Sequence, residues 1–256
     1  MKNIIRHMGR IWDEIEAQSG MLAEMSLLAV VIEAIVYLMQ SDKSRFDICL
    51  LDPYPIVSYT AGITLIPIGA LMGIFLLREE FHAERVVRMK KMRYVWLVAC
   101  LKVLTGALVL SAVSTVFCGI LGKLTASFSY AWDSPKSIFL FATGRTLESV
   151  SYGKVCLMFF TGMFFAAWAS GMLALLSYWL LGNYLWGITL VVIFSVLGTF
   201  NHYPYDLYRG ANYFNILGGF QWKYQVILPM AVVLGCIAAG FLIQRRDFLV
   251  KERQSE

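Results

Sequence analysis

Three charged side chains lie inside long apolar stretches of this sequence: Glu24, Glu33 and Lys102. A charge in such a place is costly unless it is paired or faces a polar cavity. These residues could form a buried ion pair, with either carboxylate as the partner of Lys102. They could instead line a path across a membrane, with Glu33 as the best candidate. A third interpretation lets Lys102 and Glu24 extend to the nearby membrane surface.

A second group of charges is concentrated between Arg78 and Arg93, in REEFHAERVVRMKKMR. Acidic residues come first and basic residues follow, an order that suits the dipole of a helix. Glu84 and Arg88 are spaced for a favourable pair four residues apart. The bases alone would hold this segment on the cytoplasmic side of a membrane, but that requirement does not explain the leading acids or Phe81. We therefore interpret the segment as a helix that docks a soluble partner.

The sequence offers little for catalysis. It contains no phosphate-binding GxxxxGK[ST] motif and no HExxH zinc motif. Five scattered cysteines form neither a disulfide framework nor a metal cluster. The groups that an enzyme embedded in a membrane could use are Glu24, Glu33, Lys102 and Ser170. We predict no catalytic residue and no metal ligand.

The elements that must position these residues are apolar runs of the length of a membrane span. Hydrophobic residues make up 59% of the 256 residues and charged residues 15%, against about 25% charged residues in a soluble domain. A span needs about 20 apolar residues, which lipid forces into a helix. We predict an all-α integral membrane protein with six spans. They lie at about residues 21–40, 56–77, 94–121, 155–181, 184–200 and 226–244.

The segments outside these runs set the orientation. Residues 1–20 have an apolar face and a charged face, which is typical of a helix that lies along the membrane interface. With both termini in the cytoplasm, the inner segments carry 13 Lys and Arg residues and the outer segments carry 8. That excess follows the positive-inside rule and makes residues 245–256 a cytoplasmic tail. Basic residues beside apolar runs favour contact with membrane lipids and not with nucleic acid. The sequence has no N-glycosylation sequon, which favours the inner or plasma membrane of a bacterium.

The connections between the predicted spans differ in length. Gly182-Asn183 leaves room only for a tight turn between two antiparallel helices. Residues 122–153 are polar, with a short helix expected near residues 137–143. The outer segment before the last span, TFNHYPYDLYRGANYFNILGGFQWKY, is rich in the aromatic residues that favour a membrane interface. Small residues at four-residue spacing predict close helix packing, within the chain or across a dimer: Gly69 and Gly73; Gly162, Ala166, Ser170 and Ala174; Gly235 and Ala239.

This arrangement resembles the membrane subunit of ATP-binding-cassette exporters of the type-2 permease family. The resemblance covers essentially the full length. It rests on the interfacial helix (Met1 to Ser19), the six spans and the acidic-then-basic segment after the second span. It also rests on the tight inner turn, the aromatic outer segment and the terminal RRDFLVKER.

The resemblance implies a transport function. This chain would be the permease subunit and would not be an enzyme by itself. It would bind no cofactor, because ATP and Mg would be held by a separate cytoplasmic ATPase subunit. A second permease subunit, identical or related, would complete a dimer that works by alternating access. The substrate would be amphipathic: a peptide such as a bacteriocin, a drug or a lipid. In this family a coupling helix docks on the ATPase, and the matching positions are Glu79, Glu80, Phe81, His82, Glu84, Arg85 and Val86.

Two other classes of function remain open at this point. One is a membrane-embedded enzyme. The other is a non-transporting membrane assembly or immunity subunit, which would have the same sequence features.

Overall fold

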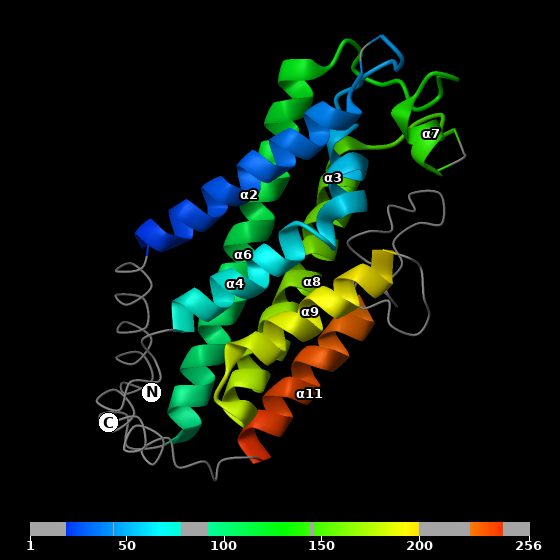
Figure 1. The fold of residues 1–256 in the computed structure, drawn as a ribbon. Coiled ribbons are helices and arrows are strands. Elements are labelled where there is room, and N and C mark those ends of the chain that lie inside the picture. Colours follow the sequence, from blue (N-terminus) through cyan, green and yellow to red (C-terminus); the bar gives the residue numbers. More distant parts are fainter. Residues whose placement is uncertain (1–18, 43, 78–91, 144–145, 200–225, 243–256) are drawn as a thin grey trace, which may run out of the picture.

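The computed structural model describes residues 19–42, 44–77, 92–143, 146–199 and 226–242, and the regular elements in these ranges are all α-helices. The prediction of an all-α protein is confirmed for this part of the chain. Long helices pack against one another along one direction (Figure 1). In chain order they are α2 (Ser19–Gln40), α3 (Pro53–Ala61), α4 (Leu65–Leu77), α6 (Met92–Thr125), α7 (Ile138–Thr143), α8 (Tyr152–Leu181), α9 (Tyr184–Thr199) and α11 (Leu228–Leu242).

Three of the described helices, α2, α6 and α8, are long and apolar enough to cross a membrane. The bent pair of α3 and α4 would make a fourth span. Helices α9 and α11 are apolar but have only 16 and 15 residues, fewer than the roughly 20 that a span needs. The chain therefore has the helices of a membrane protein, whereas six spans and two cytoplasmic termini stay predictions.

Besides the docking segment, three further predicted segments lie wholly or mostly outside the described residues. They are the interfacial helix up to residue 18, the aromatic outer segment and the tail at 245–256. The described part begins at Ser19, where α2 starts.

The predicted span at residues 56–77 is broken into α3 and α4, which are bent by 65°. The cause is Pro67 in the first turn of α4. Proline has no N–H to donate to the carbonyl of Ile63, and its ring would clash with that carbonyl in a continuous helix. The N–H groups of Ile63 and Thr64 instead share the carbonyl of Thr60, at 3.0 and 3.1 Å. Hydrogen bonds lost from the helix are thus replaced locally.

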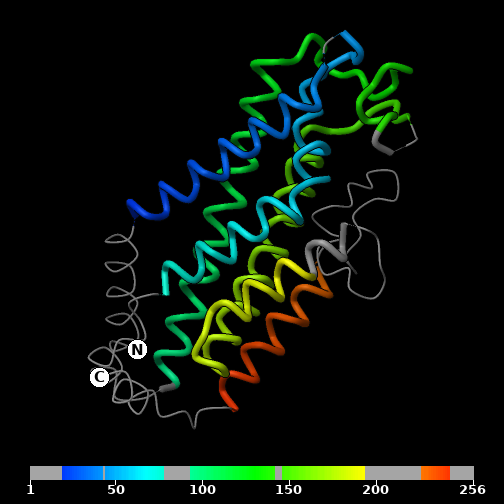
Figure 2. Tube along the Cα trace, viewed as in Figure 1, coloured from blue at the N-terminus to red at the C-terminus, as the bar shows by residue number. Residues whose placement is uncertain are grey.

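The turn predicted at Gly182-Asn183 joins α8 to α9. Gly182 has φ 68°, a left-handed conformation that glycine adopts without strain. Its N–H donates to the carbonyl of Tyr178 at 2.7 Å. The Asn183 side chain accepts the N–H of Leu185 at 2.9 Å and so begins the next helix. Helices α8 and α9 then pack antiparallel (Figure 2).

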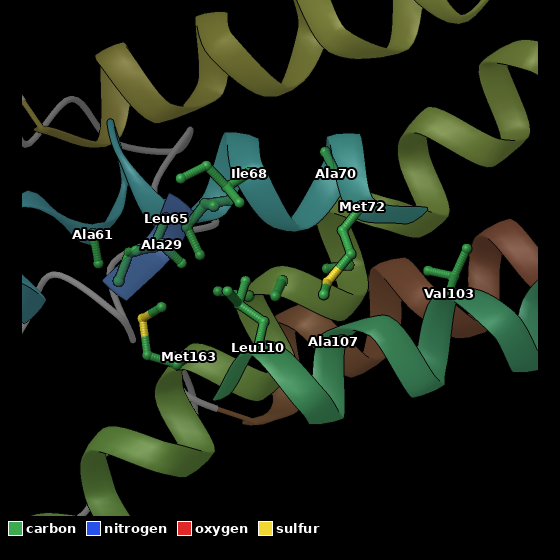
Figure 3. Close-up of a cluster of buried hydrophobic side chains, with 14 of the residues drawn as sticks. Ala29, Ala61, Leu65, Ile68, Ala70, Met72, Val103, Ala107, Leu110 and Met163 are labelled. Carbon is green, nitrogen blue, oxygen red and sulfur yellow. The ribbon is translucent and has the colours of Figure 1, made fainter. Parts of the chain in front are cut away.

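The main core lies among α2, α3, α4, α6 and α8, and α9 and α11 also contribute to it; Figure 3 shows part of this core. Small residues let these helices approach closely. A Cβ atom on Gly69 would lie 3.0 Å from Cδ2 of Leu110 and 3.2 Å from Cβ of Ala167. One on Gly171 would lie 2.5 Å from Cγ1 of Val103. These small residues of α4 and α8 therefore pack within the chain.

Two connections far apart in the sequence form one ordered cap at the end of the bundle that carries α7 (Figure 1). The N–H groups of Ser127 and Phe128 both donate to the carbonyl of Ile48, at 2.9 and 3.1 Å. Gly122 lies so close to the carbonyl of Leu50 that a larger residue would not fit. The short helix expected near residues 137–143 is present as α7. The cap comprises residues 44–52, 126–143 and 146–150.

Candidate functional site

The three charged residues predicted inside the spans have different surroundings. Glu33 on α2 is 1% exposed and Lys102 on α6 is fully buried. Glu24 is exposed on the surface of α2, in its second turn. Glu33 and Lys102 are thus interior groups, and Glu24 is not.

Glu33 belongs to the buried stripe of α2. The stripe contains Leu22, Ser26, Ala29, Glu33 and Tyr37, at the spacing that places residues on one face of a helix. One turn beyond Glu33, the hydroxyl of Tyr37 forms a hydrogen bond of 2.6 Å with the hydroxyl of Thr125. This bond holds the C-terminal ends of α2 and α6 together, so that Glu33 lies in the contact between these helices.

Ser114 of α6 faces Glu33 across this contact, but no hydrogen bond of acceptable geometry joins the two side chains. Neither oxygen of the Glu33 carboxyl has a hydrogen-bond partner in the described part of the chain, and neither does the Ser114 hydroxyl. An ionised carboxylate here would be uncompensated, which costs several kcal/mol. A proton or a bound cation would neutralise it.

Lys102 lies at a different level of the bundle. Its Nζ is 3.5 Å from the carbonyl oxygen of Leu76, near the end of α4. Ser114 lies twelve positions after Lys102 in α6, about 18 Å along the helix axis. The structure therefore does not bring Lys102 to Glu33.

A second polar cluster, which the sequence did not reveal, surrounds the hydroxyl of Tyr54 in α3. This hydroxyl lies 2.9 Å from that of Tyr152 and donates to the carbonyl of Thr115 at 3.2 Å. It also accepts the thiol of Cys156 at 3.2 Å. Tyr152 and Cys156 are four residues apart on one face of α8. Their convergence with α3 is a long-range contact for which the sequence carries no local signal.

The two polar clusters flank α6 at the same level, because Ser114 and Thr115 are neighbours in that helix. Cys118 lies one turn further along, with its Sγ 4.0 Å from the carbonyl of Pro53. Carboxyl, hydroxyl and thiol groups thus form a polar layer across an apolar bundle. Such a layer can hold a proton or a small cationic group. Among the described residues, no three His, Cys, Asp or Glu side chains are grouped to hold a metal ion.

The cap contains a buried carboxylate with good partners. Asp52 accepts the N–H of Cys49 at 2.6 Å and the indole N–H of Trp132 at 2.7 Å. Burial raises the pKa of Asp52 above its usual range, and these hydrogen bonds offset part of the rise. Burial and the Asp52 charge raise the pKa of the Cys49 thiol to about 12. The thiol therefore stays neutral at physiological pH, and this cluster stabilises the cap.

Ser170, which an intramembrane enzyme could use, donates its hydroxyl to the carbonyl of Ala166 at 2.7 Å within α8. The predicted docking residues lie outside the described part of the chain: Glu79, Glu80, Phe81, His82, Glu84, Arg85 and Val86.

The helices that flank these docking residues are described. Helix α4 ends at Leu77 and α6 begins at Met92, both at the end of the bundle opposite the cap (Figure 1). The turn at Gly182 lies at the same end.

Comparisons with protein-family models, with curated proteins and with solved structures give no significant match to this chain.

Proposed function

We propose that this chain is the permease subunit of an ATP-binding-cassette exporter and moves an amphipathic substrate by alternating access. One observation carries the proposal. The end of α4 contacts α6 at Lys102 and Gly106, and the charge-dense segment between Arg78 and Arg93 links these two helices in the chain. A partner that binds this segment would act directly on two helices of the core.

The packing of α4 and α6 suits the transmission of such a movement. A Cβ atom on Gly106 of α6 would lie 3.1 Å from Cδ1 of Leu76 in α4, and Lys102 of α6 contacts the Leu76 carbonyl. These contacts join the end of α4 to the interior of α6. The break before Pro67 lets α4 tilt relative to α3, which Tyr54 attaches to α6 and α8.

The other components follow from the same proposal. ATP and Mg are held by a separate cytoplasmic ATPase, and a second permease subunit completes the transporter in the bacterial cell membrane. The substrate is a peptide, a drug or a lipid.

The proposal predicts a loss of coupling when the docking segment is altered. We expect Glu80→Lys with Glu84→Lys to abolish the stimulation of ATPase activity by substrate in the reconstituted complex. The reversal replaces acids at the start of the docking helix, where its dipole favours negative charge. The thermal unfolding of the membrane bundle should not change. The measurement is ATP hydrolysis in proteoliposomes with and without substrate.

A matched control reverses two exposed acids of the cap, Asp133→Lys with Glu148→Lys. This variant changes the net charge equally at the opposite end of the bundle and should keep full stimulation. Normal stimulation of ATPase activity by substrate in the Glu80/Glu84 variant would contradict the docking helix.

A further inference from the structure

We propose that Glu33 and Ser114 form a binding site for a primary ammonium group, carried by a cationic amphipathic substrate. This inference rests on the proposed export function and names the chemical class of its substrate. The site consists of the Glu33 carboxyl on α2 and the Ser114 hydroxyl that faces it from α6.

The unpartnered state of Ser114 is specific to its position. The other serine and threonine side chains of α6 donate to the carbonyl four residues earlier: Thr105 to Leu101, Ser111 to Ala107, Thr115 to Ser111 and Thr125 to Leu121, at 2.7 to 3.0 Å. Buried polar groups are normally satisfied in this way. Ser114 departs from the pattern at the one position that faces a buried carboxyl, so both groups remain available to a ligand.

The chemistry of the site matches an ammonium group. Glu33 offers two carboxyl oxygens and Ser114 one hydroxyl oxygen, and none of the three has a hydrogen-bond partner in the described part of the chain. An ammonium group carries three N–H donors and no acceptor. Its hydrogen bonds to a carboxylate are charge-assisted and stronger than neutral ones. An anionic head group would be repelled by the ionised carboxyl, and a neutral head group would give the carboxyl no reason to lose its proton.

The position of α2 gives an amphipathic molecule a route to the site. The face of α2 opposite its buried stripe exposes Leu27, Val31, Ile35 and Leu38, as a lipid-facing helix does. When α2 separates from α6, an ammonium head could enter between these helices while its apolar tail stays in lipid. The Tyr37–Thr125 hydrogen bond is the polar contact that this separation breaks.

Binding should release one proton. With α2 and α6 in contact, neither oxygen of the Glu33 carboxyl has a hydrogen-bond partner among the described residues, so we expect the carboxyl to keep its proton. When R–NH₃⁺ binds, the carboxyl O–H ionises, the carboxylate pairs with the ammonium and the proton passes to water. Two other titratable side chains lie near this carboxyl. The Cys118 thiol of α6 is within reach of its charge, and the Tyr37 hydroxyl is bonded to Thr125.

The test uses the full chain in lipid nanodiscs and dodecylammonium as the probe, with dodecanol as an uncharged probe of equal length. We expect saturable dodecylammonium binding that is accompanied by proton release, measured by calorimetry in buffers of different ionisation enthalpy. Glu33→Gln should weaken this binding by about tenfold or more and abolish proton release. Ser114→Ala should weaken it less, and dodecanol binding should stay the same in all variants.

Glu24→Gln is the matched control, because it removes an exposed carboxylate of the same helix. It should leave dodecylammonium affinity unchanged, and the thermal unfolding of each variant checks the fold. Equal affinity of wild type and Glu33→Gln, or an equal loss in Glu24→Gln, would overturn the site. The assay contains no ATPase, so this result is independent of the coupling experiment. Glu33-dependent binding would support the site even if no ATPase docks on the chain.

Discussion

At the scale of single residues, the two buried carboxyl groups in the described part of the chain differ in their hydrogen bonding. Asp52 in the cap has two hydrogen-bond donors, whereas Glu33 has none. The difference separates a group that stabilises the fold from one that is available to a ligand.

We expect Asp52→Ala to destabilise the folded protein. The N–H of Cys49 and the indole N–H of Trp132 would each lose a buried acceptor, at about 1–3 kcal/mol for each donor. The measurement is the free energy of unfolding in detergent. Asp42→Ala is the control, because the Asp42 carboxylate accepts its hydrogen bonds from Ser44 at the exposed surface. An equal loss of unfolding free energy in both variants would contradict a stabilising role for the two buried hydrogen bonds of Asp52.

The raised pKa of Asp52 also predicts a pH dependence. The folded state binds this proton more tightly than the unfolded state, whose aspartate has a pKa of about 3.9. The contribution of Asp52 to stability therefore increases as the pH falls through the folded pKa toward that value. The free energy of unfolding of wild type relative to Asp52→Asn should rise over this window. A constant or falling difference would contradict the assignment.

Some residues of the polar layer are conspicuous in the sequence, and others are not. Glu33 and Lys102 stood out because a charge in an apolar run is conspicuous. Ser114 did not, because serine is common in membrane helices and Glu33, the residue that it faces, lies 81 positions earlier. The cluster around Tyr54 is likewise formed by residues of three different helices, which no local pattern reveals.

At the scale of helices, small residues fix how closely the elements pack. Gly240 of α11 lies against the ring of Trp96 in α6, with no space for a Cβ atom. The indole N–H of Trp96 donates to the carbonyl of Ile237 at 3.2 Å, and its ring lies 5.0 Å from that of Trp179 in α8. Trp96 thus holds three helices together.

Gly240→Ala should therefore reduce the free energy of unfolding by about 1–3 kcal/mol, the usual cost of overpacking. Gly235→Ala is the matched control on the same helix, because nothing lies within 4 Å of an added Cβ atom there. That change should be neutral or stabilise the helix by up to about 1 kcal/mol. Equal effects in the two variants would show that α11 does not pack on Trp96 in this way.

Apolar runs predicted where helices form, but not how they bend. Helices α2, α6 and α8 cover the runs at 21–40, 94–121 and 155–181. The run at 56–77 was expected as one helix, and Pro67 breaks it. Composition alone does not reveal such a break. Pro67 lies in the middle of the run, and the structure accommodates it by starting a new helix, α4, so that Pro67 falls in the first turn, where proline is tolerated.

At the scale of the whole molecule, the bundle has two different ends. One end carries the ordered cap held by hydrogen bonds between residues 44–52 and the connection after α6. The other carries the tight turn at Gly182 and the ends of α4 and α6. Sequence composition predicted a helical membrane protein, and the charge-dense segment is visible in the sequence itself. The contacts that unite the cap come from segments distant in the sequence, so they required the structure.

The central claim is that a soluble ATPase docks on this chain through the segment between Arg78 and Arg93. The most direct measurement is affinity purification of the chain from its native host in mild detergent, with identification of the proteins that accompany it. We expect a cassette ATPase in stoichiometric amount, which is lost when the charges of Glu80 and Glu84 are reversed and retained when those of Asp133 and Glu148 are reversed. Recovery of the chain without an ATPase would contradict the exporter function and favour a membrane-embedded enzyme or an assembly subunit.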